Sequence, residues 1–106
     1  MDQLRFPLGH YQKPEFITPQ IIDTYILVIE NFPTLLKAEV LHLTNAQLDT
    51  PYRPEGWTIR QVVHHCADSH ANSLIRFKLA LTEEKPTIKP YCEDLWAELE
   101  DSKLAP

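Results

Sequence analysis

The sequence predicts an all-α protein with two long helices. Two stretches, 19–43 and 58–83, carry apolar residues at the three- and four-residue spacing of an amphipathic helix. Each stretch begins beside a threonine that can cap a helix, Thr18 for the first and Thr58 for the second. No stretch shows the alternation of apolar and polar residues that marks a half-buried strand, so we expect no sheet.

Segments without helical periodicity flank and separate the two helices. Residues 1–17 contain two prolines and no sustained period, which predicts an extended arm. Residues 44–57 predict a short turn followed by a loop. The final segment, 84–106, predicts an extended loop with a short helix at 93–98 around Trp96.

The first helix has a recognisable start and an internal interruption. Thr18 can serve as the N-cap, with Pro19 at the first helical position. Pro33 removes one helical hydrogen bond, so the pattern predicts one helix kinked at Pro33, or two consecutive helices, over 19–43. The apolar residues at helical spacing are Ile22, Tyr25, Ile26 and Ile29 before this proline, and Leu35, Leu36, Val40 and Leu43 after it.

The second helix has the clearer start. Thr58 is followed three residues later by Gln61, which is the arrangement of a capping box. From Ile59 to about Glu83 there is neither proline nor glycine, and the run ends before Pro86. These signals predict an uninterrupted helix over 58–83.

Length and composition exclude several classes of function. With 106 residues the chain is at most one domain, and its formal net charge of -5 disfavours nucleic-acid binding. No apolar run approaches the ~18 residues that a membrane span needs. The N-terminus has no apolar signal core, and Cys66 and Cys92 have neither zinc-knuckle nor disulfide-framework spacing. We therefore expect a cytoplasmic protein that binds neither nucleic acid nor membranes.

The stretch 62-VVHHCADSH-70 is the strongest candidate for a functional site. A step of about 100° per residue places His70 in the apolar stripe of the second helix, beside Cys66. His64 points elsewhere, near Asp68. A third, polar stripe holds His65, Ser69, Asn72 and Arg76. The three histidines therefore face three directions, and no two can bind one metal ion from this helix alone.

Most of these residues also have an ordinary structural explanation. His64 would be a surface histidine paired with Asp68, and His70 a core histidine with one hydrogen-bond partner. Cys66 would be a small buried thiol. The polar stripe that contains His65 either lines a cleft or faces water. Four more residues would be ordinary surface or packing residues: His10, His42, Trp57 and Trp96.

The segment 51–102, with the run 57-WTIRQVVHHCADSH-70 as its most specific part, closely resembles the YfiT-like branch of the DinB superfamily. The stretches 5-RFPLGHYQKP-14 and 47-QLDTPYR-53 fit the same branch. The resemblance implies a four-helix bundle that binds a divalent metal, zinc or nickel, through three histidines. It implies that His65 is the first ligand and that the other two come from an H-x-x-x-H pair on a late helix.

The resemblance further implies a metal-dependent hydrolase that acts on a small-molecule substrate through a metal-activated water or thiol. Some family members resemble S-transferases that conjugate a low-molecular-weight thiol such as bacillithiol, and that activity is the alternative. On the polar side of the helix, Asp68 could orient a metal ligand, and Arg76 could meet an anionic substrate group. Asn72 would line the same cleft.

The sequence also departs from the family pattern. It contains no H-x-x-x-H, and Cys66 stands where the family usually has leucine. We therefore expect residues 1–106 to be a single partial domain, the N-terminal half of the bundle, which lacks two metal ligands and a partner for its apolar stripe. The partner would be a missing C-terminal half or a second copy in a homodimer, which would bring two His65 side chains. The contrasting hypothesis is a catalytically inactive helical fragment that acts only as a dimer or binding module.

Overall fold

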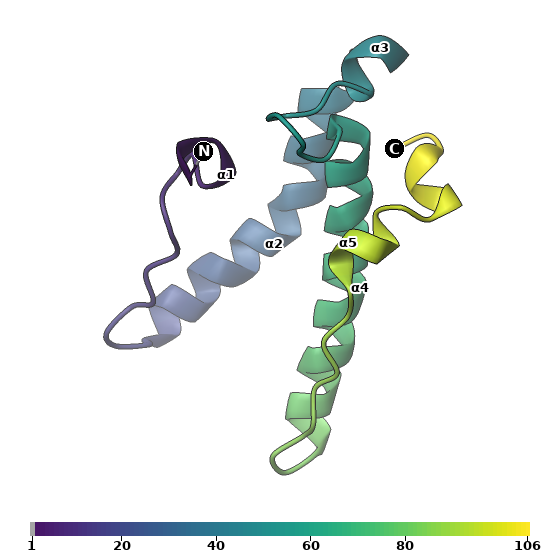
Figure 1. Ribbon diagram of the computed structural model, residues 1–106. Coiled ribbons are helices and arrows are strands. Elements are labelled where there is room, and N and C mark those ends of the chain that lie inside the picture. The colour runs from purple at the N-terminus through teal and green to yellow at the C-terminus, as the bar shows by residue number, and fades with distance from the viewer. Residues whose placement is uncertain (1) are drawn as a thin grey trace. The chain divides into compact units, whose positions relative to one another are not determined.

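The computed structural model describes residues 2–106, and this part of the chain is helical without a strand. The elements are α1 (Asp2–Arg5), α2 (Pro19–Val40), α3 (Asn45–Leu48), α4 (Ile59–Thr82), α5 (Glu93–Trp96) and the 3-10 turn η1 (Glu100–Lys103) (Figure 1). The all-α prediction is thereby confirmed. The chain divides into two compact units, Met1–Asn45 and Ala46–Pro106, which are described separately.

The first unit is dominated by α2. The Thr18 hydroxyl accepts a hydrogen bond from the Ile21 amide at 3.2 Å, and Pro19 occupies the first helical position, where its missing N–H costs nothing. The helix runs as one element through Pro33 to Val40. No residue of α2 is buried.

The arm that precedes α2 differs from the prediction at its beginning. Residues 1–17 were expected to be extended, yet Asp2–Arg5 forms one helical turn. This turn ends ahead of Pro7, because a residue before proline is pushed away from helical geometry. Gly9 then adopts a φ of 84°, which glycine tolerates, and its amide donates to the Phe6 carbonyl at 2.8 Å. The ring of His10 lies 4.0 Å from that of Phe6, centroid to centroid.

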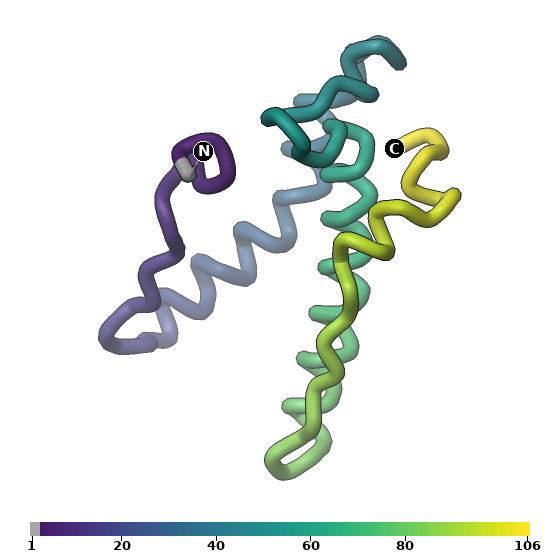
Figure 2. Tube along the Cα trace, in the orientation of Figure 1, coloured from purple at the N-terminus to yellow at the C-terminus, as the bar shows by residue number. Residues whose placement is uncertain are grey.

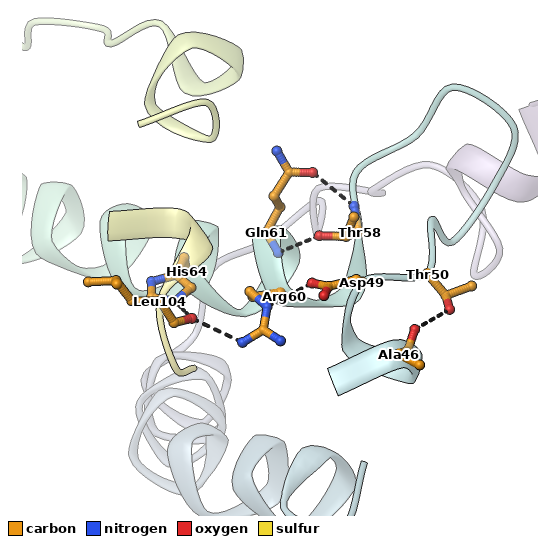
Figure 3. A network of polar contacts seen from close by, with 8 residues as sticks. All are labelled: Ala46, Asp49, Thr50, Thr58, Arg60, Gln61, His64 and Leu104. Atoms are coloured by element: carbon orange, nitrogen blue, oxygen red, sulfur yellow. Dashed lines mark hydrogen bonds and ion pairs between the residues drawn. The ribbon is translucent and has the colours of Figure 1, made fainter. Parts of the chain in front are cut away.

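In the second unit, a loop held by two backbone hydrogen bonds leads into α4. The amide of Tyr52 donates to the Trp57 carbonyl at 3.0 Å, and the amide of Ile59 donates to the Thr50 carbonyl at 3.1 Å. The helix then begins with the predicted capping box. The Gln61 amide donates to the Thr58 hydroxyl at 3.1 Å, and the Thr58 amide donates to the Gln61 side-chain oxygen at 3.0 Å (Figure 3).

Removing this cap should measurably destabilise the second unit. We expect Thr58→Ala to lower the free energy of unfolding by about 1 kcal/mol, because the Gln61 amide loses its acceptor. Thr58→Ser keeps the hydroxyl and should retain most of the stability. Both tryptophans of the chain, Trp57 and Trp96, lie in this unit, so urea unfolding followed by tryptophan fluorescence isolates it. Equal losses in the two variants would contradict the capping role.

After α4 the chain reverses and returns along the same helix (Figure 2). Lys85, with a φ of 49°, lies in the reversal. The returning segment ends in α5 and η1, which hydrogen bonds join to the first turns of α4. The Gln61 side-chain amide donates to the Ala97 carbonyl at 2.8 Å, and the Leu104 carbonyl accepts from Arg60 Nη1 at 3.2 Å. The prediction of a loop with one short helix therefore missed the turn η1.

The core of the second unit is small and lies at this junction. Leu48 and Ala97 are its buried apolar residues, and Ser102 is buried with its hydroxyl donating to the Trp96 carbonyl at 3.2 Å. Farther along α4 the apolar stripe is open, with 59% of Phe77 and 84% of Leu81 exposed. None of the helices within residues 2–106 combines the length and apolar character that crossing a membrane requires.

Candidate functional site

His65 lies in the second turn of α4 and is held by an aromatic contact. Its ring packs against the indole of Trp57 with the ring centroids 4.8 Å apart and the planes tilted by 50°. The side chain is half-buried. No residue within 2–106 forms a hydrogen bond with either ring nitrogen of His65, so both nitrogens remain available to a ligand.

Asn72 and Arg76 on the polar stripe, and Asp68 beside it, are the other predicted site residues, and their surroundings differ. The Asn72 side-chain amide donates to the backbone carbonyl of Asp68 at 2.9 Å, one turn back along the helix. Asp68 is half-buried, and no described hydrogen bond joins its carboxylate to His65. Asn72 and Arg76 both line a groove farther along α4. The structure thus places Asn72 and Arg76 together and does not link Asp68 to the candidate ligand.

The structure corrects the expected environment of His64. Its Nε2 lies 3.1 Å from the Leu104 carbonyl oxygen and makes no ion pair with Asp68, contrary to the prediction (Figure 3). The cause is the returning segment, whose turn η1 covers the first turns of α4 and offers a carbonyl to the histidine. His70 is half-buried, and His10 and His42 are exposed as predicted.

The two cysteines are both free thiols. Cys66 is half-buried on the apolar side of α4, and its burial raises the pKa of the thiol because loss of water disfavours the thiolate. A thiol held in its neutral form is a poor nucleophile and a poor metal ligand. Cys66 therefore fits the predicted structural role. Cys92 is exposed and precedes α5.

Tyr91 is a residue of this region that the sequence did not single out. Its ring packs on Trp96 with centroids 4.6 Å apart. Partial burial raises the pKa of the phenol, and the negative charges of Asp68 and Glu93 raise it further. The positive charge of Arg76 and a hydrogen bond with Ser69 act in the opposite direction. The phenol thus lies near Asp68, Ser69 and Arg76 of α4 and is neutral at neutral pH.

The raised pKa of Tyr91 makes the stability of the second unit depend on alkaline pH. An unfolded phenol ionises near pH 10, whereas the folded protein favours its neutral form. The resulting stabilisation is complete below about pH 10 and is lost as the pH rises through the folded pKa. Urea midpoints measured between about pH 9 and about pH 11 should therefore fall more steeply in the unmodified chain than in Tyr91→Phe. Parallel curves would show that the phenol is not shifted.

The groove lies within the second unit, between α4 and the returning segment. Its volume is about 550 Å³ and it is open to solvent. Its apolar lining includes Ile75, Leu79, Ile88, Pro90, Leu95 and Trp96. The polar lining includes Asn72, Arg76, Lys89, Tyr91 and Cys92. Tyr91, which lines the groove, is close enough to Ser69 for that side chain to affect its pKa, and Ser69 lies one helical turn from His65.

A metal ion would need more ligands than this site offers. In the described part of the chain, no three His, Cys, Asp or Glu side chains gather in an arrangement that could hold a metal ion. Catalytic zinc sites use about three protein ligands and keep one open position. His65 supplies a single imidazole, so the residues described here do not by themselves fit a zinc or nickel centre.

Comparison with known proteins identifies the family. The sequence profile of the DinB superfamily matches residues 29–105. The solved structure of YfiT from Bacillus subtilis superposes with a TM-score of 0.92 at 56% sequence identity, covering 98% of this chain and 59% of that one. YfiT is described there as "a probable metal-dependent hydrolase with an unusual four-helix bundle topology". The chain belongs to the DinB superfamily, which confirms the resemblance and the helical-bundle class.

Close relatives come from other Bacillus species. A protein of Bacillus cereus strain B4264, named "putative metal-dependent hydrolase", is 59% identical over 104 residues, covering 98% of this chain and 60% of the relative. A protein of Bacillus anthracis strain A0248 with the same name matches with the same identity and coverage. The chain thus spans 60% of the length of these relatives.

Proposed function

We propose that this chain is part of a metal-dependent hydrolase of the YfiT type and that His65 is one of its metal ligands. The metal-dependent hydrolase names of the relatives support the class of reaction. The assignment of His65 is supported by the position of its ring. Trp57 packs against the ring, and neither ring nitrogen makes a hydrogen bond with a residue within 2–106. His64, in contrast, is already engaged by the Leu104 carbonyl.

The remaining metal ligands would come from outside these 106 residues. No cluster of three potential ligands exists among residues 2–106, and the relatives are longer than this chain. The open apolar side chains of α4, such as Phe77 and Leu81, would suit a further helix that brings those ligands. A second copy of the chain would cover the same surface but would add only another His65.

The proposal assigns the other site residues as follows. Tyr91, held neutral, would donate a hydrogen bond to a substrate oxygen, because it lies beside Ser69 in the turn next to His65. Asn72 and Arg76 would hold the part of the substrate that lies in the groove. Asp68 would act on the site through its charge near Tyr91.

The test joins this chain to the region of the Bacillus cereus strain B4264 relative that lies outside the match. We expect the joined protein to retain zinc or nickel stoichiometrically after dialysis and to hydrolyse simple esters or amides, with the activity removed by a chelator and restored by metal. The 106-residue chain alone should retain no stoichiometric metal. A joined protein that folds but retains no metal would overturn the proposal. Conjugation of a thiol to an electrophile, without hydrolysis, would assign thiol transfer instead.

A further inference from the structure

We propose that the groove between α4 and the returning segment binds an elongated organic anion. The acidic group of the ligand would lie on Arg76 and Lys89, and its apolar body would lie along Ile75, Leu79 and Ile88. This goes beyond the proposed function by naming the class of ligand. The inference rests on the proposed function only where it takes this ligand to be the substrate. Binding in the groove itself does not require the metal.

The charge of the groove is the first observation. Arg76 and Lys89 both line it, in a chain whose formal net charge is -5. Neither cation forms an ion pair with any residue that the structure describes, whereas Arg60 and Lys103 each have a carboxylate partner. Arg76 is half-buried, so water screens its attraction to a ligand carboxylate less than it would on an open surface. Two uncompensated cations in one groove favour an anionic ligand.

The neighbouring charges determine where the acidic group of the ligand would lie. Asp68 and Glu93 act on the phenol of Tyr91 as negative charges and Arg76 acts on it as a positive charge, so an anion is disfavoured beside the two acids and favoured on the side of Arg76. Arg76 lies about two turns beyond Asp68 along α4, and Lys89 belongs to the returning segment. The acidic group should therefore lie at Arg76 and Lys89, with the remainder of the ligand free to extend toward Tyr91.

The apolar lining is the second observation. Ile75 is 59% exposed, Ile88 46% and Leu95 66%, although all three face one groove. Covering apolar surface is worth about 25 cal/mol per Å², so a ligand with an apolar body gains affinity here that a small inorganic anion does not. The volume of about 550 Å³ is within the range of sites for small organic molecules.

The position of the groove connects it with His65. Tyr91 lines the groove near Ser69, which is one turn from His65. Helix geometry puts Arg76 about 16 Å from His65 along the axis, at about 1.5 Å per residue. A ligand anchored at Arg76 would thus need an extended body for its other end to approach the candidate metal ligand.

The test uses the 106-residue chain without metal and compares three probes with the same carbon skeleton: phenylbutyrate, phenylbutanol and phenylbutylamine. Binding is followed by the fluorescence of the tryptophans, of which Trp96 lines the groove. We expect the carboxylate to bind at least about tenfold more tightly than the alcohol, and the amine to bind most weakly. Acetate, which has the charge without the body, should bind at least about tenfold more weakly than phenylbutyrate.

Charge-neutralising variants locate the binding. Arg76→Gln and Lys89→Gln should each weaken phenylbutyrate binding several-fold and leave phenylbutanol unchanged, while Arg76→Lys should retain much of the affinity. Lys78→Gln, on another face of α4, is the matched control and should have no effect. If Arg76→Gln fails to fold, Lys89→Gln alone tests the anion site, because Lys89 is exposed and its replacement should not affect folding.

A further variant separates this inference from the proposed function. His65→Ala should leave phenylbutyrate binding unchanged, because the ring of His65 does not line the groove. If the joined protein retains no metal while the 106-residue chain still binds phenylbutyrate, the proposed hydrolase is rejected and the anion site in the groove stands. Equal affinities for the acid and the alcohol, or an equal loss in Lys78→Gln and Arg76→Gln, would overturn the anion site.

Discussion

His65→Ala is expected to lower the metal affinity of the joined protein at least about a hundredfold. Residues that merely orient a metal ligand contribute about 10- to 100-fold to affinity, so a direct ligand should contribute no less. The substitution should leave the fold intact, because His65 is only half-buried and makes one ring contact, with Trp57. Zinc and nickel titrations in the presence of a competing chelator measure the effect, with tryptophan fluorescence as the check on folding.

The matched control for this substitution is His64→Ala. His64 is adjacent in sequence, but its Nε2 is directed at the Leu104 carbonyl oxygen at 3.1 Å. Its removal should lower stability slightly and leave metal affinity unchanged. Metal affinity that survives His65→Ala and is lost in His64→Ala would reject the proposed ligand and would place the metal at the junction with η1.

Asp49→Ala should be the most destabilising of the single substitutions considered for the second unit. Arg60 is 8% exposed, and its Nε donates to the Asp49 carboxylate at 2.8 Å (Figure 3). Removing the acid leaves a buried guanidinium without its carboxylate, which costs about 3–5 kcal/mol when both partners are buried. The Asp49 side chain is 60% exposed, so water compensates in part and we expect about 1–2 kcal/mol.

The control for Asp49→Ala is a pair on the surface of the same unit. Lys103 and Glu100 form an ion pair at 3.2 Å with side chains that are 57% and 89% exposed. Such pairs contribute little, so Glu100→Ala should leave the urea midpoint almost unchanged. Equal midpoints for Glu100→Ala and Asp49→Ala would show that the buried guanidinium does not depend on its partner.

The local features of the fold could be predicted because they depend on neighbouring residues. The N-caps Thr18 and Thr58 and the capping box at Gln61 involve residues three positions apart, and all three are observed. The turn Asp2–Arg5 and the 3-10 turn Glu100–Lys103 were missed. Each is a single turn, too short to show helical periodicity in the sequence.

The candidate site could be predicted only where it lies on one helix. The stripe that contains His65, Asn72 and Arg76 follows from helical geometry, and Asn72 and Arg76 do line one groove. Tyr91 and the partner of His64 could not be found in this way, because both depend on how the segment after Lys85 returns along α4. Pro86 and Pro90 indicate that this segment is extended, but not which face of the helix it follows.

The junction between α4 and the end of the chain has a consequence for the order of folding. The bonds from Gln61 to Ala97 and from Arg60 to Leu104 join residues 36 and 44 positions apart, whereas the capping box joins residues three apart. Contacts between distant residues must close a long loop before they contribute, so they should form after α4 itself. The amides of Ser102 and Leu104 should therefore be the last of this unit to gain protection from hydrogen exchange during refolding. By the same reasoning, the turn η1 should be the first element to detach in the native protein, and its detachment would uncover His64 while α4 remains helical.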